Sequence, residues 1–118
     1  MKPFKPRGGK KKPETILQER IIKMMRYKGW FVKSLHGNLY QSGFPDLYCT
    51  HRIYGHRFIE VKMPTRTGDV FTPAQHEVFP QLCANGAGVW VLIADTEQEY
   101  EKLFKKYNWY LFLEAFKS

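Results

Sequence analysis

The sequence predicts an α/β domain in which a helix, three strands, a second helix and a fourth strand follow one another along the chain. Apolar side chains recur at helical spacing over residues 13–28, and Thr72-Pro73-Ala74-Gln75 has the capping-box pattern that opens a helix. Residues 88–94 instead form a short, uninterrupted apolar run, which is typical of a strand buried on both faces. Such a strand belongs in a core that helices cover.

The composition indicates one domain, residues 13–118, because the 118-residue chain is 43% hydrophobic and can bury a single core. The formal net charge of +8 favours a polyanionic partner such as nucleic acid. No long apolar segment supports a membrane-bound protein. Cys49 and Cys83 stand singly within apolar runs, so we expect buried thiols in a reducing compartment and no zinc site.

Residues 1–12 carry six basic side chains and no acidic one, so we expect a disordered basic arm. Its Lys10, Lys11 and Lys12 are candidate phosphate contacts. The alternative is a solvated tail without a role in binding.

The first predicted helix covers residues 13–28 and ends at Gly29, which can adopt the left-handed conformation of a helix cap. Glu14 and Gln18 fall in the same sector as the apolar stripe, whereas Glu19 points well away from it. A carboxylate aligned with a buried stripe is unusual, so Glu14 is a candidate site residue. The alternative is that Glu14 only favours the helix dipole. The side chains of the stripe are Leu17, Ile21, Met24 and Met25.

Three strands are expected over residues 30–35, 46–50 and 57–62. The loop between the first two is rich in glycine and polar residues, so it can approach a ligand closely. Lys33, Ser34 and His36 are candidate phosphate contacts there, although a simple loop histidine is the favoured interpretation of His36. Arg66, in the loop over 63–70, is a further candidate. We do not expect His51 and His56 to bind a metal, because they flank a turn and nothing orients them together.

The second half of the chain begins with a helix over 73–84, in which Pro80 implies a kink or a break and Asn85-Gly86 forms the cap. The strand over 88–94 is expected at the centre of the sheet because it is apolar throughout. A third helix is expected from Thr96 through Lys106. Residues 108–113 are expected to form either an edge strand covering the core or a dimer surface.

The chemistry-bearing residues lie on the second and third strands. Asp46 follows Pro45 at the start of one strand, and Glu60 and Lys62 project from one face of the next. If the two strands pair as a hairpin, both carboxylates and the ammonium group converge. Oxygen ligands beside a cation that orients water suit a hard divalent ion. The alternative is a surface salt bridge between Glu60 and Lys62.

Five pieces in order resemble the virus-type replication-repair (VRR-NUC) branch of the PD-(D/E)xK nuclease superfamily. They are Glu14, Gln18, Gly43-Phe44-Pro45-Asp46-Leu47, Ile59-Glu60-Val61-Lys62 and Phe71-Thr72-Pro73-Ala74-Gln75, within residues 14–94. The resemblance implies a restriction-endonuclease-like α-β-β-β-α-β core, a mixed sheet flanked by helices. It also implies that Asp46 and Glu60 hold Mg²⁺ with the Val61 carbonyl and with support from Glu14, directly or through water, and that Mn²⁺ can substitute.

The same resemblance implies hydrolysis of DNA phosphodiester bonds, with Lys62 positioning or activating the attacking water. Gln75 stands at the family's glutamine position, which implies a role in holding DNA or an active-site water. The capping box alone also explains this residue, and we expect one side chain to serve only one of these two roles. Branched DNA such as a four-way (Holliday) junction is the implied substrate, read by shape and backbone. Cutting two strands needs two active sites, so we expect a homodimer.

The implied setting is cytoplasmic: a phage-encoded protein in a bacterial host, acting in viral DNA replication or repair. Two alternatives share the fold and the charge. One is a module that binds nucleic acid without cleaving it, and the other is an interaction subunit of a larger complex. Cleavage that depends on a divalent metal would separate the nuclease from both.

Overall fold

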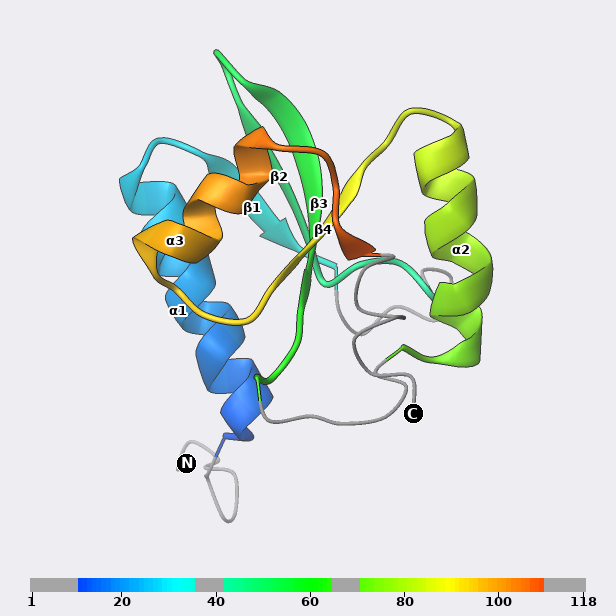
Figure 1. The fold of residues 1–118 in the computed structure, drawn as a ribbon. Helices are drawn as coiled ribbons and strands as arrows, with labels where there is room; N and C mark the ends of the chain where they lie inside the picture. Colours follow the sequence, from blue (N-terminus) through cyan, green and yellow to red (C-terminus); the bar gives the residue numbers. More distant parts are fainter. Residues whose placement is uncertain (1–10, 36–41, 65–70, 110–118) are drawn as a thin grey trace, which may run out of the picture.

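The computed structural model describes residues 11–35, 42–64 and 71–109. Its helices and strands run in the order α1 (Pro13–Tyr27), β1 (Phe31–Ser34), β2 (Leu47–His51), β3 (Gly55–Val61), α2 (Pro73–Ala84), β4 (Val89–Leu92) and α3 (Glu97–Tyr100) (Figure 1). The protein is therefore a mixed α/β fold, as the sequence predicts. A 3₁₀ turn, Glu101–Phe104, follows α3.

The four strands form one mixed sheet in the order β1-β2-β3-β4. β1 pairs antiparallel with β2, β2 antiparallel with β3, and β3 parallel with β4. The β2–β3 hairpin aligns Leu47 with Ile59 and Tyr48 with Phe58. This register carries the functional argument, because a slip by one residue would turn every side chain of a strand to the other face.

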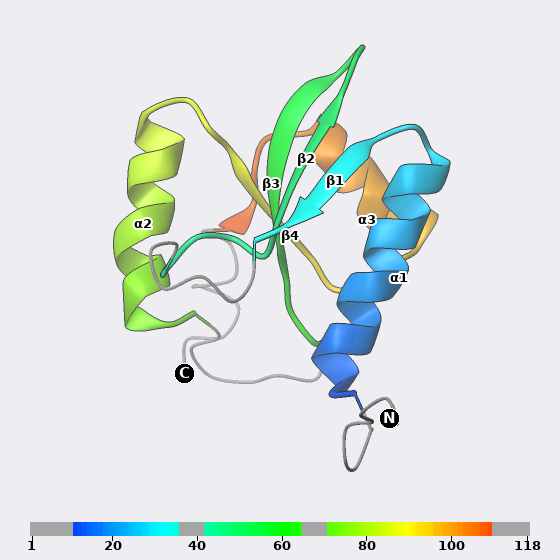
Figure 2. The same cartoon turned by 180° about the vertical axis from the view of Figure 1, so that it is seen from behind.

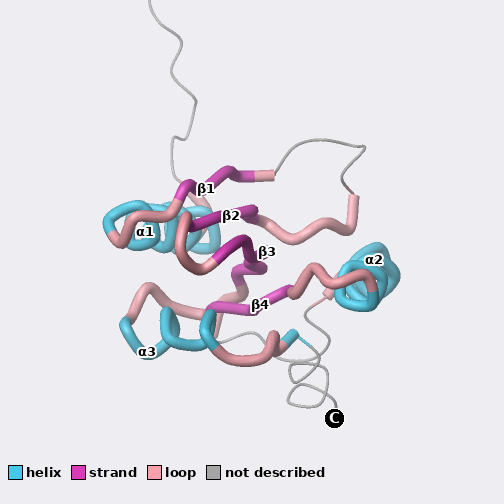
Figure 3. The backbone as a smooth tube through the Cα atoms, turned by 90° about the horizontal axis from the view of Figure 1, so that it is seen from above, coloured by secondary structure: helices cyan, strands magenta, loops and turns pink. Residues whose placement is uncertain are grey.

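Helices cover both faces of the sheet, and Figure 3 shows α1 and α3 on one side and α2 on the other. The larger apolar cluster lies under α1 and α3 and includes Ile21, Met25, Ile59 and Leu92, all with no exposed surface. The smaller cluster lies under α2. It consists of Phe71, Phe79, Val89, Val91 and Trp109. Figure 2 shows the same arrangement from behind.

Helix α1 follows the sequence rules closely. Pro13 occupies its first turn, where a missing N–H costs nothing. Gly29 follows the helix with a φ of +96°, so the expected left-handed cap is confirmed. Helix α2 ends at the expected Asn85-Gly86, with a φ of +93° at Gly86. It runs unbroken through Pro80, so of the two expected alternatives, a kink or a break, the break is wrong.

Strand β4 lies at the edge of the described sheet, which corrects the expectation that it is central. All four of its residues are buried nevertheless. The side-chain amide of Asn108 covers the outer edge: its Oδ1 accepts from the Val91 N–H at 2.7 Å, and its Nδ2 donates to the Val91 carbonyl at 3.2 Å. Asn108 thus replaces a neighbouring strand, and burial of β4 does not require a central position.

The carboxy-terminal part also differs from expectation. The third helix is shorter than predicted, because α3 ends at Tyr100 and a 3₁₀ turn completes the segment. Asn108 lies outside any strand, and both Asn108 and Trp109 are buried, while the remainder of the 108–113 prediction lies outside the described residues. Of the thiols, Cys49 is buried and Cys83 is half-buried. Within the described ranges, every helix is too short or too polar to traverse a bilayer.

Candidate functional site

Asp46 and Glu60 face each other across the β2–β3 hairpin, as the sequence predicts. Asp46 immediately precedes Leu47, whose partner is Ile59, so Asp46 stands opposite Glu60. The Glu60 carboxylate accepts from the Asp46 backbone N–H at 3.1 Å. In return, the Asp46 carboxylate accepts from the Val61 backbone N–H at 2.8 Å. This reciprocal pair holds both carboxylates against the backbone of the opposite strand.

Lys62 completes the group at the end of β3. Its ammonium nitrogen lies 3.0 Å from Glu60 Oε2, and the two side chains are only 8% and 2% exposed. The same ammonium group lies 5.3 Å from the centre of the Phe71 ring, a cation–π contact. The alternative of a surface salt bridge is therefore wrong, because this ion pair is buried. An ion pair taken out of water needs additional partners to hold it.

Gln75 supplies one of those partners from α2. Its amide nitrogen donates to Glu60 Oε2 at 3.0 Å. Its side-chain amide oxygen simultaneously accepts from the Thr72 backbone N–H at 3.1 Å. The Gln75 backbone N–H donates to the Thr72 hydroxyl, which completes the capping box. The cap is therefore confirmed, and the implied role in holding DNA or an active-site water stays a prediction. The two ends of the amide act separately, so the helix cap also orients the Glu60 carboxylate.

Burial makes both carboxylates reluctant to ionise. The pKa of Asp46 is raised to about 6, first by burial and then by the nearby charge of Glu14, although the Val61 N–H and Lys62 oppose the rise. The pKa of Glu60 is raised to about 8 by burial and by Asp46, against the opposing effects of Lys62 and Gln75. One ammonium group thus compensates two buried acids only in part, and the pair has residual affinity for positive charge.

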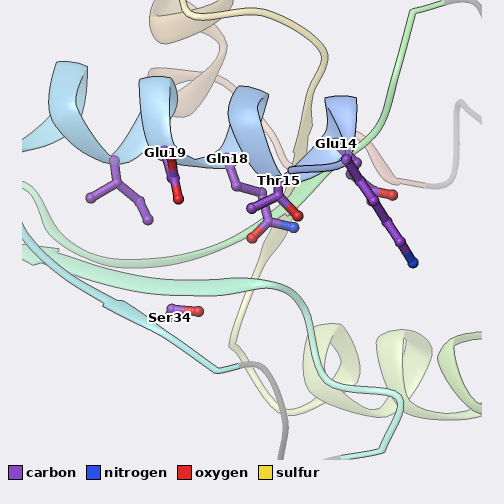
Figure 4. A pocket seen from close by; sticks show the side chains of 7 residues that line it. Glu14, Thr15, Gln18, Glu19 and Ser34 are labelled. Atoms are coloured by element: carbon purple, nitrogen blue, oxygen red, sulfur yellow. The ribbon is translucent and has the colours of Figure 1, made fainter. Parts of the chain in front are cut away.

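Glu14 lies near this pair but outside it. It is half-buried in the first turn of α1, close enough for its charge to raise the Asp46 pKa. Glu14 and Gln18 line a groove of about 540 Å³ that also reaches Ser34 on β1 (Figure 4). Gln18 is buried, while Glu19 is exposed and pairs with Lys11, which agrees with the predicted phase of the helix.

The carboxylates form a pair rather than a larger cluster. Among residues 11–35, 42–64 and 71–109, no three histidine, cysteine, aspartate or glutamate side chains gather into a potential metal site. His51 packs against Trp30, and its Nδ1 accepts from the Ile53 N–H within the turn. A metal at this site would therefore be held by Asp46 and Glu60, with Glu14 beyond direct reach and water completing the shell.

This donor set suits Mg²⁺. Mg²⁺ prefers one or two carboxylates and keeps several waters, which two carboxylates with an adjacent backbone carbonyl satisfy. The Val61 N–H contacts Asp46, and the Val61 carbonyl stays the predicted backbone ligand that the resemblance implies. A divalent cation would also stabilise the ionised forms of these two buried acids, whose negative charge Lys62 compensates only in part. The residues present therefore fit the ion that the resemblance implies.

The candidate phosphate contacts are placed only in part. Lys33 and Ser34 are exposed on β1, and Ser34 borders the groove beside Glu14. Lys11 and Lys12 are exposed just before α1, and the pairing of Lys11 with Glu19 ties the end of the arm to the helix. Lys10, His36, Arg66 and the rest of the arm over 1–10 lie outside the described residues.

Sequence reasoning missed Phe71 and the position of Thr72. The Phe71 ring lies beneath the Lys62 ammonium group, and the Thr72 cap positions Gln75. The capping-box pattern indicated the helix start, but no sequence signal places that start over Glu60. Comparison of the chain with protein-family models, with curated proteins and with solved structures finds no match in any of the three.

Proposed function

We propose that the chain is a DNA endonuclease that depends on a divalent metal and has the restriction-endonuclease-like core of the virus-type replication-repair nucleases. One observation carries the proposal: Asp46, Glu60 and Lys62 meet in one buried group at the ends of adjacent strands. The order α-β-β-β-α-β and the mixed sheet support it. The net charge of +8 suits a polyanionic substrate.

The chain's own residues divide the work of phosphodiester hydrolysis. Asp46 and Glu60 would hold Mg²⁺, with Mn²⁺ as a substitute, and the bound ion supplies positive charge for the developing charge on phosphate. Lys62 stands beside Glu60, where its ammonium group can orient a water toward the phosphorus. Gln75 donates to the same Glu60 oxygen, Oε2, that Lys62 contacts, so the acid enters the reaction already oriented.

The substrate proposed is branched DNA, such as a four-way junction, cut by a homodimer in viral or phage DNA replication or repair. A chain with one site needs a partner copy to cut two strands. Sedimentation of the purified protein measures this state. A monomer at working concentration that still cuts both strands would contradict the dimer.

Cleavage of labelled four-way junctions, flaps and plain duplexes in Mg²⁺, Mn²⁺ and EDTA tests the nuclease proposal. Asp46→Asn and Glu60→Gln keep the shape of each side chain and remove its charge. We expect each to lower the cleavage rate by roughly a thousandfold, since each would remove a ligand from the ion that stabilises the reacting phosphate. Binding of the same DNA in EDTA should persist.

Glu97→Gln is the matched control. Glu97 is an exposed glutamate that forms an ion pair with Lys28, and both residues are distant in sequence from Asp46 and Glu60. It should cleave like the wild-type protein. Full activity of Glu60→Gln would overturn the metal-site assignment. A wild-type protein that binds every substrate and cleaves none in either metal would favour the non-catalytic binding module instead.

A further inference from the structure

The described helices cover only part of the α2 side of the sheet. Helix α2 packs over β4, whereas no described helix lies over the same face of β1 and β2 (Figure 3). Strand alternation turns every second side chain of β1, β2 and β3 to this open part. These side chains are Phe31, Lys33, Tyr48, Thr50, His56 and Phe58. Three of them, Phe31, Lys33 and His56, are exposed, and Phe31 keeps 61% of its surface.

Four rings on this face form a continuous row, which we call the aromatic row: Phe44, Phe58, Tyr48 and His56. Phe58 packs against the cluster under α2, and Phe44 borders Val78 of that helix, so the row runs from the edge of α2 onto the open part. Phe44 meets Phe58 edge-on at 6.1 Å between ring centres, and Phe58 meets Tyr48 at 5.5 Å. Tyr48 meets His56 at 6.1 Å with an interplanar angle of 34°. Phe44 and His56 are exposed, and Phe58 and Tyr48 are half-buried. Apolar ring surface therefore remains in contact with solvent along the row.

The aromatic row leads to the carboxylate pair. Tyr48 lies two residues after Asp46 on one strand, and Phe58 lies two residues before Glu60 on the next, so all four project from the same face. Phe44 stands two residues before Asp46 at the near end of the row. A ligand that lies along the row therefore ends at Asp46 and Glu60.

The chemistry of the row suits unpaired bases. Exposed aromatic side chains bind single-stranded nucleic acid by stacking, and any base offers a π face for that contact. Bases inside a duplex are already stacked on one another and offer only their edges. Lys33 stands opposite Tyr48 in the register of β1 and β2, and its side chain is exposed. A cation therefore lies beside the rings, where it can bind a phosphate.

We propose that the aromatic row binds the unpaired bases of single-stranded nucleic acid and leads that strand to Asp46 and Glu60. This inference rests on the proposed nuclease function and names its substrate more closely: a branched structure with an unpaired arm or gap. A second protein chain is a less suitable occupant, because it would cover the approach to the carboxylates along the row.

Binding of a fluorescent oligothymidylate, and of a blunt duplex of the same length, tests the proposal in EDTA, where no cleavage occurs. Tyr48→Leu and Phe58→Leu should each weaken single-strand binding by about tenfold, the loss of roughly one stacked base. Duplex binding should change much less. Tyr48→Phe keeps the ring and should retain wild-type affinity. Lys33→Gln should flatten the salt dependence of binding by about one unit of slope.

Tyr54→Leu is the matched control, because Tyr54 is an exposed aromatic residue on the same hairpin but packs against Trp30 and Phe104 instead. It should bind like the wild-type protein. Thermal unfolding of each variant checks that the sheet remains folded. Photocrosslinking of an oligonucleotide that contains 5-iodouracil should place the adduct on a peptide that includes Tyr48 or Phe58, and this readout needs no variant.

Three results would overturn the proposal: wild-type affinity in folded Tyr48→Leu and Phe58→Leu, equal losses for single strand and duplex, or crosslinks confined to other segments. A change in sedimentation of Tyr48→Leu with unchanged DNA binding would identify the row as a contact between copies. Because these assays measure binding without metal, they remain decisive even if the chain proves unable to cleave. Conversely, cleavage with no contribution from the row would leave the nuclease proposal standing.

Discussion

The amide nitrogen of Gln75 donates to the Glu60 carboxylate at 3.0 Å while the amide oxygen of the same side chain caps helix α2. The orientation of a buried acid therefore depends on the start of a helix that is distant in sequence. Both partners are buried, so water competes little for these hydrogen bonds. Local helix stability and the geometry of the site are thus coupled through one side chain.

This coupling predicts that Gln75 variants affect both stability and cleavage, whereas Thr72 variants affect mainly stability. Gln75→Ala should lower both the free energy of unfolding and the cleavage rate, because it removes the cap contact and the Glu60 contact together. Thr72→Ala should cost about 1 kcal/mol of stability, the usual loss of an N-cap, with a smaller effect on cleavage. Chemical denaturation and cleavage rates measure the two quantities.

Gln81→Ala serves as the control on the same helix. Within the described residues, the Gln81 side-chain amide makes its hydrogen bond to the Glu77 carbonyl and none to the carboxylate pair. It should leave cleavage unchanged. Equal effects of Thr72→Ala and Gln75→Ala on cleavage would show that Gln75 acts only through the cap.

Lys62→Met should abolish cleavage, because it retains most of the aliphatic volume over Phe71 but removes the ammonium group beside Glu60. The Glu60 pKa should then rise further, since Lys62 is one of the groups that lower it. Lys28→Met, which breaks an ion pair between α1 and α3, is the control. A Lys62→Met protein that cleaves at the wild-type rate across the pH range would remove the lysine from the mechanism.

The raised carboxylate pKa values predict that the metal-free protein loses stability as pH increases. An acid with a higher pKa in the folded state favours folding below its unfolded pKa of about 4. That advantage disappears as pH rises through the folded values, about 6 for Asp46 and about 8 for Glu60. Stability attributable to this pair should therefore fall between about pH 4 and pH 8.

Mg²⁺ should counter this loss, because it binds the ionised pair and competes with protons. The rise in Tm on adding Mg²⁺ should therefore be larger at pH 8 than at pH 5.5, and Glu60→Gln should show little rise at either pH. The difference between wild-type and Glu60→Gln Tm curves isolates the pair from the other acids. A rise independent of pH, or equal in the variant, would contradict the assignment.

Glu14→Gln should weaken cleavage more than Glu19→Gln. Glu14 lies within electrostatic reach of Asp46, whereas Glu19 is exposed and pairs with Lys11. Because Glu14 acts from outside the carboxylate pair, its loss should reduce the rate without abolishing it, and the Asp46 pKa should fall. Cleavage rates across pH measure both effects. The reverse ranking would show that the Lys11–Glu19 side of α1 faces the substrate instead.

Much of the fold could be predicted because local rules decide it. Pro13 and Gly29 mark the two ends of α1 through a missing N–H and a positive φ, and Thr72 with Gln75 marks the start of α2. The strands followed from apolar runs between turns. Spacing of two residues placed Glu60 and Lys62 on one face of β3, and this was confirmed.

The tertiary structure decided where those elements lie relative to one another. The position of β4 at the edge of the described sheet could not be predicted. An apolar strand has the same sequence pattern whether a neighbouring strand or the Asn108 amide covers its edge. Likewise, the capping box predicted the start of α2 but not its position over Glu60, because only packing brings Phe71 and Gln75 there.

By itself, then, the sequence determined which residues could act together: two acids and a lysine at fixed spacings on two strands that can pair. The meeting of Asp46 with Glu60 was decided by the hairpin register, which aligns Leu47 with Ile59. Period-two alternation makes that register all-or-none, since a shift of one residue would place the acids on opposite faces. Burial in the folded protein then sets their charge, because desolvation depends on the whole fold and not on neighbours in sequence.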